Sequence, residues 1–200
     1  EDERLYASLN GHLGIFNPET LEWLGGDWQE IGYGRYNRFM IDENILWLST
    51  DDSIGTIDVS DPQNITQIST LEADSPEFNQ DTTSQAEYLY QLTGGYCYPE
   101  NGIMVCLDRE LKLFNIIDPA NISFVSSIVI PEGINQITEY NDFLILSGED
   151  LWLVDTTNPG QPQIIDQFET PGYADDVLIM GDLIYIADRT GGLLILRLVE

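Results

Sequence analysis

The sequence is poor in basic side chains. It holds seven Lys and Arg residues against 35 Asp and Glu residues, and its formal net charge at pH 7 is -28. Lys112 is the single lysine. A negative field of this strength repels phosphate groups, so we expect neither a nucleic acid partner nor an anionic membrane surface. Cations or a basic protein are favoured instead, unless the acidity serves solubility alone.

Histidine and cysteine are almost absent as well. One histidine, His12, and two cysteines are too few for a zinc site built from these residues. No Ser-His-Asp or Cys-His set and no glycine-rich phosphate loop is apparent, and His12 lies in "NGHLG", where we expect an exposed loop. Paired carboxylates such as Asp175 and Asp176 keep one enzymatic alternative open, a glycoside- or calcium-dependent hydrolase. With so many acids, however, such pairs arise by chance.

Long apolar runs are missing too. No stretch of about 18 apolar residues occurs, so we expect no membrane span. Hydrophobic residues still make up 42% of the 200 residues, which is enough for a packed core in one domain. The first residues, "EDERLY", do not resemble a signal peptide. They fall inside the repeat described next, so we expect that the chain was processed or trimmed upstream of them.

A short phrase recurs along the chain: an apolar run closed by Asn or Asp and proline. It ends at Pro18, Pro62, Pro119 and Pro159, at intervals of roughly 40 residues or somewhat more. The Asn or Asp side chain can bond its own backbone while proline fixes φ, so we expect a turn at the end of one strand per repeat.

Each repeat is built from short β-rich runs separated by turn residues. The last one reads "QIIDQFET", "YADDVLIM", "LIYIAD" and "LLILRL", and the one before it has the same order. Four short strands per period of about 40 residues are typical of propeller blades, whose sheets stack face to face to bury their apolar sides. The sequence therefore predicts an all-β fold, a β-propeller of four-stranded blades.

The stretch "LWLVDTTNPGQPQIIDQFETPGYADDVLIMGDLIYIADRTGGLLIL" also resembles the LVIVD-repeat family. Members of that family are taken to be β-propellers that are secreted or lie on cell surfaces. Earlier repeats of the chain match more loosely, and residues 72–95 depart from the pattern. The resemblance implies a fold and an extracytoplasmic location, and it brings no catalytic residues.

Counting strands gives about four and a half units, from "RLYASLN" to "LLILRL", and about five blade-equivalents could close a small ring. We expect one β-propeller domain over residues 1–200, either a small ring or a fragment of a larger propeller. The segment from Glu72 to Tyr88 breaks the repeat, so an insertion is predicted near residues 72–90. Insertions in one blade often form surface loops on the binding face.

The two cysteines flank a hairpin signal in "YCYPENGIMVCLD". Asn101-Gly102 favours a two-residue type I′ turn, and counting outward from it pairs Cys97 with Cys106. Alternation makes this a non-hydrogen-bonded pair, with Cα atoms about 4.5 Å apart, within reach of a disulfide. The alternative is two buried thiols. A disulfide would indicate an oxidising compartment.

Polar residues stand at the start of the first strand of several repeats, where a buried strand should be apolar. In a propeller this strand lines the central channel, so these residues should meet at one mouth and form a binding site. Arg38 matters most, because it is a cation among carboxylates. A channel filled with water would need polar residues as well. The candidate ligand-binding residues are Asn37, Arg38, Tyr96, Asn135, Gln136, Asp175 and Asp176.

Carboxylates also recur in the loops between the second and third strands of the repeats. Oxygen ligands suit calcium, but no EF-hand pattern is present and solvated loops are the alternative, so we expect no cofactor and keep calcium open. These carboxylates are Asp51, Asp52, Asp108, Glu110, Glu149, Asp150 and Asp188.

Taken together, the sequence predicts a non-catalytic binding or interaction module. Its expected location is extracellular, on the cell surface or periplasmic, and its expected partner is a protein or a small polar or cationic ligand. The ligand would bind at the mouth of the channel, and the carboxylate hydrolase at the same place is the alternative.

Overall fold

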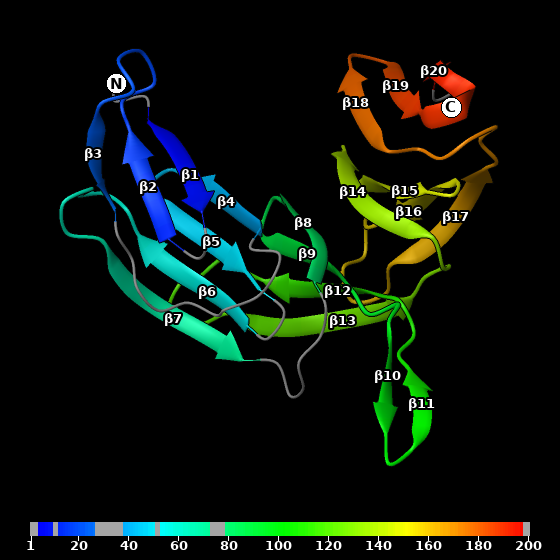
Figure 1. Ribbon diagram of the computed structural model, residues 1–200, viewed down its shortest axis with the longest axis horizontal. Helices are drawn as coiled ribbons and strands as arrows, with labels where there is room; N and C mark the ends of the chain where they lie inside the picture. The colour runs from blue at the N-terminus through cyan, green and yellow to red at the C-terminus, as the bar shows by residue number, and fades with distance from the viewer. Residues whose placement is uncertain (1–3, 10–11, 27–37, 51–52, 73–78, 198–200) are drawn as a thin grey trace. The chain divides into compact units, whose positions relative to one another are not determined.

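The computed structural model describes residues 4–9, 12–26, 38–50, 53–72 and 79–197 (Figure 1). In these residues the strands form six sheets, and one short 3-10 helix, η1 (Arg189–Gly191), is present. No helix in the described ranges is long and apolar enough to cross a membrane. The chain divides into two compact units, Glu1–Asn79 with Ile116–Ser123 and Gln80–Asn115 with Phe124–Glu200.

The first unit stacks a three-stranded sheet on a four-stranded sheet. The former has the order β1 (Leu5–Leu9), β2 (His12–Phe16) and β3 (Trp23–Gly26). The latter has the order β4 (Arg38–Asp42), β5 (Ile45–Ser49), β6 (Ser53–Asp58) and β7 (Thr66–Glu72). Alternate apolar residues of both sheets fill the space between them, because successive side chains of a strand point to opposite faces. The buried residues of this apolar cluster are Leu13, Ile15, Leu46, Leu48, Ile57 and Val59.

The second unit stacks three sheets and carries a separate hairpin (Figure 1). The first sheet contains β8 (Asn79–Gln85), β9 (Tyr88–Thr93), β12 (Glu110–Asn115) and β13 (Ser123–Val129). The second contains β14 (Ile134–Tyr140), β15 (Phe143–Gly148), β16 (Leu151–Asp155) and β17 (Gln163–Phe168). The third contains β18 (Asp176–Met180), β19 (Leu183–Asp188) and β20 (Gly192–Arg197). The hairpin consists of β10 (Cys97–Glu100) and β11 (Ile103–Cys106).

Two apolar clusters hold the sheets of the second unit together. Leu92, Leu111 and Leu146 belong to the cluster between the first and second sheets. Ile145, Val177 and Ile186 belong to the cluster between the second and third. The prediction of an all-β fold made of short, stacked, sequentially connected sheets is confirmed.

Three of the four turns with Asn or Asp before proline show the predicted side-chain bonding. The Oδ1 atom of Asn17 accepts hydrogen bonds from the N–H groups of Glu19 and Thr20, both at 2.9 Å. The corresponding atoms of Asp61 and Asp118 each accept a backbone N–H two residues later, at 3.0 Å. These bonds compete with continued strand pairing, so the strand ends there.

The proline of three of these turns, at positions 62, 119 and 159, also bonds to the preceding repeat, which the sequence does not reveal. The carbonyl oxygen of Pro119 accepts hydrogen bonds from the hydroxyls of Thr56 and Ser69, both at 2.7 Å. The carbonyl oxygen of Pro159 accepts one from Ser126 at 2.6 Å, and that of Pro62 one from the N–H of Gly26 at 2.9 Å. The recurrent phrase therefore both ends a strand and ties it to the repeat before it.

The predicted insertion near residues 72–90 needs correction. Part of this segment forms β8 and the start of β9, and β8 is a regular edge strand of its sheet. Its polar side chains bond to the neighbouring sheet and its loops instead of packing on them. Asp81 accepts the N–H of Ile137 at 2.9 Å, Thr83 donates to Glu139 at 2.6 Å, and Gln85 accepts the Thr156 hydroxyl at 3.1 Å. A strand that bonds in this way lacks the apolar alternation by which strands are recognised.

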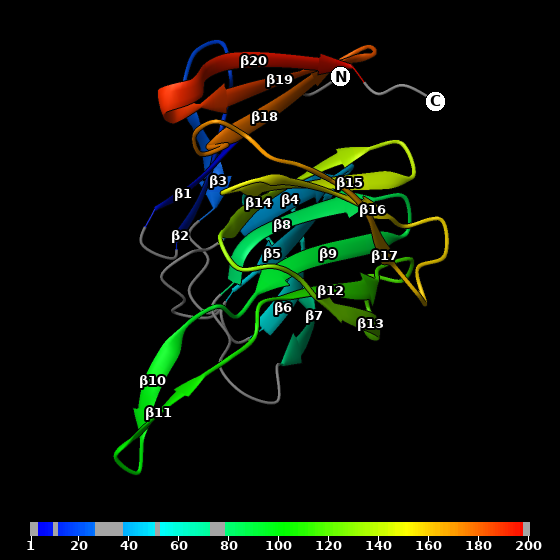
Figure 2. The same cartoon turned by 90° about the vertical axis from the view of Figure 1, so that its right-hand side faces the viewer.

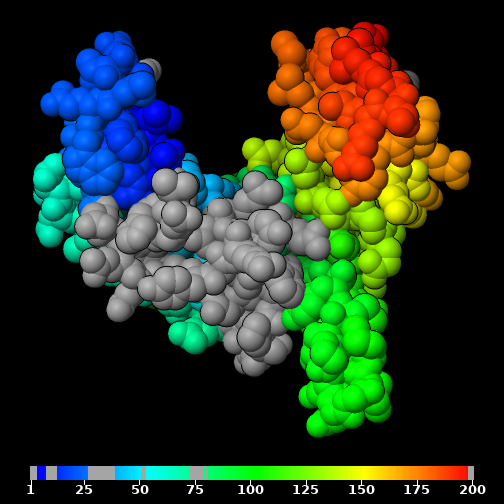
Figure 3. All heavy atoms as spheres, viewed as in Figure 1, coloured from blue at the N-terminus to red at the C-terminus, as the bar shows by residue number. Residues whose placement is uncertain are grey.

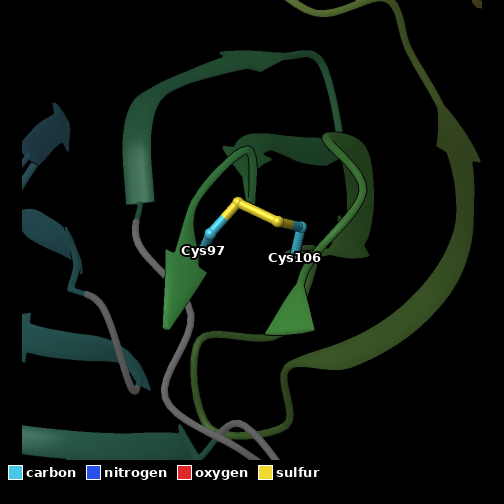
Figure 4. Close-up of a disulfide and its surroundings, with 2 residues drawn as sticks. All are labelled: Cys97 and Cys106. Atoms are coloured by element: carbon cyan, nitrogen blue, oxygen red, sulfur yellow. A yellow bond between two sulfur atoms is a disulfide. The ribbon is translucent and has the colours of Figure 1, made fainter. Parts of the chain in front are cut away.

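The additional length of this repeat lies in the hairpin β10–β11 between β9 and β12. Its register is the predicted one, from Glu100 opposite Ile103 to Cys97 opposite Cys106. Cys97 and Cys106 form a disulfide with Cα atoms 4.0 Å apart (Figure 4), which confirms the predicted bond. Both cysteines are exposed, so the alternative of two buried thiols is wrong.

We expect the protein isolated under oxidising conditions to carry no thiol that reacts with iodoacetamide. After reduction, two alkylations should appear, on Cys97 and Cys106, because these are the two cysteines of the chain. Intact mass with and without reductant measures this. Two alkylations before reduction would contradict the disulfide.

Two further turn aspartates predict a pH dependence. The carboxylate of Asp155 accepts hydrogen bonds from the N–H and the hydroxyl of Thr157, at 2.9 and 2.7 Å, which lower its pKa. Hydrogen bonds from Ser60 lower the pKa of Asp58 in the same way. A carboxylate with a lowered pKa stabilises the fold above the unfolded pKa of about 3.9, and this contribution is lost as pH falls through the folded pKa.

The variant Asp155→Asn should therefore be less stable than the original chain at about pH 6, and the difference should shrink at about pH 2.5. Urea denaturation of both chains at the two pH values measures this. A difference that is the same at both would mean that the charge on Asp155 plays no part.

Candidate functional site

A network of polar side chains lies in the second unit, where β14 and β18 begin. It contains two residues that the sequence predicts as ligand-binding, Asn135 in β14 and Asp175 directly before β18, and three other side chains join them. We call it the polar network. Its members are Arg109, Asn135, Tyr173, Asp175 and Arg189.

Arg109 forms the buried part of the polar network. It stands just before β12 and is only 6% exposed. Its Nη1 donates to the carbonyl oxygen of Ile134 and, at 3.3 Å, to Oδ1 of Asn135. Nε of Arg109 lies 3.9 Å from a carboxylate oxygen of Glu132, which is largely exposed. Burial lowers the pKa of Arg109, and the charge of Glu132 opposes this shift.

Asn135 connects Arg109 to the exposed part. It is the extra residue of a bulge in β14, where the register with β15 shifts between Ile134 and Gln136. A bulge turns one side chain away from the regular alternation of the strand. The Nδ2 group of Asn135 donates to the hydroxyl of Tyr173, and this hydroxyl donates to the carbonyl oxygen of Gly133 at 3.2 Å.

The exposed part is an arginine held over a tyrosine ring. The guanidinium carbon of Arg189 lies 4.2 Å from the centre of the Tyr173 ring, a cation–π geometry. Both carboxylate oxygens of Asp175 lie within 2.9 Å of Arg189 nitrogens. The side chains of Arg189 and Asp175 are 57% and 46% exposed, so solvent reaches the pair.

These contacts shift the pKa values of Asp175 and Tyr173. The hydrogen bond from Arg189 lowers the pKa of Asp175, which keeps this carboxylate ionised. Burial raises the pKa of Tyr173, so its hydroxyl stays a donor near neutral pH, although Arg189 and Arg109 oppose the shift. The polar network therefore presents one carboxylate, one guanidinium and one phenol of settled charge.

The other predicted site residues do not join the polar network. Gln136 is half-buried in β14 beside Asn135, and Asp176 begins β18, where its carboxylate accepts its neighbour's N–H at 2.9 Å. Arg38 begins β4 in the first unit, as its alignment with the other repeats predicts. Asn37 lies outside the described residues.

The expected position of Tyr96, at the start of the first strand of its repeat, was wrong. This residue stands before β10, next to Tyr98 with ring centres 5.9 Å apart, and not at the start of a sheet. The corresponding position belongs to Asn79 at the start of β8, which is buried and donates to the hydroxyl of Ser49 at 2.9 Å. The apolar pattern of the hairpin β10–β11 resembles that of a sheet strand, whereas the edge strand of this sheet, β8, is polar.

The loop carboxylates that the structure describes make separate contacts. Among the described residues, no group of three His, Cys, Asp or Glu side chains is placed to hold a metal ion. Asp150 accepts hydrogen bonds from Gln167 and Thr170, and Glu110 lies 3.8 Å from Lys112. Asp51 and Asp52 lie outside the described residues. His12 was expected in a loop, but it begins β2, because β1 and β2 pair as far as Leu9 and His12.

A comparison with curated protein sequences found no match. Among solved structures, the chain is similar to the crystal structure of BamB from Moraxella catarrhalis, with a TM-score of 0.64 and 11% sequence identity. The similarity covers 98% of this chain and 55% of that one, so the chain spans about half the length of that structure. At this identity the similarity concerns the fold and supports a β-propeller architecture.

A comparison with protein families matched residues 171–196 to the LVIVD repeat. The matched segment includes β18, β19 and most of β20, together with Tyr173, Asp175 and Arg189 of the polar network. It lies within the stretch whose resemblance to this family the sequence already shows. The chain therefore contains an LVIVD repeat, which builds the last of its sheets.

Proposed function

We propose that this chain is a non-catalytic interaction module outside the cytoplasm, and that it binds a protein or a polar ligand through the polar network. In a propeller, the first strands of successive blades line a central channel, so the network would lie at the mouth of that channel. The module would need no cofactor.

The observation that carries the proposal is the gathering of arginines. Arg109 and Arg189 are two of only seven basic residues in the chain, and both belong to the same network. Arg109 and Asn135 hold Tyr173, and Tyr173 in turn supports Arg189. The exposed guanidinium is thus preorganised, which reduces the cost of ordering it when a partner binds.

The geometry favours binding over hydrolysis at this place. Two catalytic carboxylates would need different protonation states, one of them a general acid with a raised pKa. Asp175 is instead bound to Arg189, and its pKa is lowered. The pair Asp175 and Asp176 therefore does not support a hydrolase. The disulfide Cys97–Cys106 supports an oxidising, extracytoplasmic compartment, because exposed disulfides do not persist in the cytosol.

Capture of partners with the tagged full chain tests the proposal. Extracellular and periplasmic extracts of the source organism would be passed over the original chain and the variants Arg189→Ala and Arg197→Ala, and bound proteins quantified by mass spectrometry. Arg197 is the matched control, since it forms an exposed pair with Asp182 at 3.0 Å in the same sheet. We expect Arg189→Ala to lose a partner that Arg197→Ala retains, with or without EDTA. Equal capture by all three chains would overturn the proposed site.

A further inference from the structure

The hairpin β10–β11 is a weakly charged, disulfide-closed element on a very acidic protein. Between Gly95 and Leu107 only Glu100 is charged, whereas the chain as a whole carries a net charge of -28. A two-residue turn closes one end of the hairpin, and the disulfide Cys97–Cys106 closes the other. In both ribbon views it stands apart from the other strands of its unit, and Figure 3 shows it as a protrusion (Figures 1, 2 and 3).

The register fixes which backbone groups of the hairpin point outward. Asn101 and Gly102 have φ values of 49° and 80°, which is the geometry of a type I′ turn. This turn makes Glu100 and Ile103 a hydrogen-bonded pair, and such pairs alternate along an antiparallel ladder. The pairs Pro99–Met104 and Cys97–Cys106 are therefore non-hydrogen-bonded, and their remaining backbone groups face the outer edges.

The two outer edges differ. On β10, Pro99 has no N–H at the outward position, which blocks that edge for another strand. On β11, Met104 and Cys106 each offer an outward N–H and C=O. The sheet has only two strands, so these groups pair with no other strand among the described residues. β11 has no lysine, proline or bulge, the devices that commonly protect an exposed edge.

The side chains of β11 indicate what would pair with it. Ile103 and Met104 are 69% and 60% exposed, so the strand presents large apolar groups on both faces. Exposed carboxylates stand near its two ends, Glu100 across the turn and Asp108 after Cys106. A complementary strand has apolar side chains in its middle and basic residues at its ends.

We propose that β11 is a docking edge for another protein, to which an extended segment with an apolar centre and basic ends adds as a third strand. Main-chain hydrogen bonds to Met104 and Cys106 would hold this segment, and contacts with the exposed side chains of Ile103 and Met104 would select it. A second copy of the chain is disfavoured, because it brings the same negative charge. This inference does not depend on the polar network.

Synthetic peptides labelled with fluorescein test the docking edge on the full oxidised chain. The probe has a core of alternating valine and threonine with two lysines at each end. One control peptide has the same lysines and a proline in the centre of the core, so its charge is equal but it cannot form a regular strand. A second control has the same core with glutamates in place of lysines. Fluorescence anisotropy measures binding, and amide hydrogen exchange locates it.

Two variants at position 104 distinguish the contribution of the backbone N–H to peptide binding from that of the side chain. Met104→Pro removes the outward N–H, and it resembles Pro99 on the opposite strand, so the disulfide-closed hairpin should persist. Met104→Ala keeps the N–H and removes most of the side chain. We expect the lysine-flanked peptide to protect the amides of Met104 and Cys106, and Met104→Pro to weaken its binding roughly tenfold or more. Met104→Ala should weaken it less.

Three outcomes would overturn the inference. The first is equal binding of the straight and the proline-containing lysine peptides, which would mean attraction by charge alone. The second is no binding of any peptide, or binding that Met104→Pro does not change. The third is a dimer of the chain in sedimentation experiments that Met104→Pro dissolves, which would make a second copy the occupant.

Discussion

The variant Gly148→Ala should unfold about 3 kcal/mol more easily than the original chain, because the added methyl group meets backbone and not a movable side chain. A Cβ atom on Gly148 would lie 1.9 Å from the carbonyl oxygen of Gly133 and 2.8 Å from the Cα of Ile134. That carbonyl accepts the N–H of Glu149 at 3.1 Å and the Tyr173 hydroxyl at 3.2 Å. Relief of the clash must therefore move a segment that also holds the polar network, and urea denaturation measures the cost.

Gly160→Ala is the matched control for this substitution. The nearest atom to a Cβ at Gly160 is Oδ1 of Asn158 at 3.5 Å, an ordinary contact. Loss of glycine's freedom in the unfolded chain should make this variant as stable as the original or more stable, by up to about 1 kcal/mol. If Gly148→Ala were as well tolerated as Gly160→Ala, the close approach of β15 to Gly133 would be disproved.

Features that depend on neighbours in the sequence could be predicted. The turn Asn101-Gly102 determines the register of its own hairpin, so the pairing of Cys97 with Cys106 follows from counting residues. The Asx-Pro turns follow from side chains that bond backbone two residues away. The strands of the second and third sheets of the second unit follow from apolar alternation between turn residues. All of these are local effects.

Features that depend on residues far away in the sequence could not be predicted. β8 is polar because Asp81, Thr83 and Gln85 bond to another sheet, and no pattern within "NQDTTSQ" indicates this. The hairpin β10–β11 has the alternation of a sheet strand, although it forms a two-stranded sheet of its own. Tyr96 was therefore placed at the start of the wrong strand.

The polar network shows the same limit. Asn135 and Asp175 were found because they interrupt apolar strands at equivalent places. Arg109 bonds to a carbonyl 25 residues away, and Arg189 and Tyr173 meet across a whole hairpin, so neither contact leaves a local pattern. The sequence held one signal for these two arginines, the rarity of basic residues. Arg109 and Arg189 each follow an aspartate, and an arginine in so acidic a chain indicates a structural role.

The variant Arg109→Met should lose about 2–4 kcal/mol of unfolding free energy, although it keeps an unbranched apolar stem of similar reach. Arg109 is 6% exposed and donates to the carbonyl oxygen of Ile134 and to Oδ1 of Asn135. Methionine donates no hydrogen bond, so these oxygens would lose their charged donor inside the protein, which costs their desolvation. Urea denaturation at neutral pH measures the change.

Arg197→Met is the control for the loss of an arginine as such. The side chain of Arg197 is 62% exposed, and its Nε lies 3.0 Å from a carboxylate oxygen of Asp182. Solvent screens this pair, so its loss should cost less than about 1 kcal/mol. Both substitutions remove one positive charge from a chain with few of them, so the general electrostatic effect cancels in the comparison. If the two variants lost equal stability, the cost would come from net charge and Arg109 would not be the buried support of the polar network. A larger loss for Arg109→Met would instead support Arg109 as the buried support of the polar network. In that case the buried cation holds Asn135, and Asn135 in turn positions Tyr173 and Arg189.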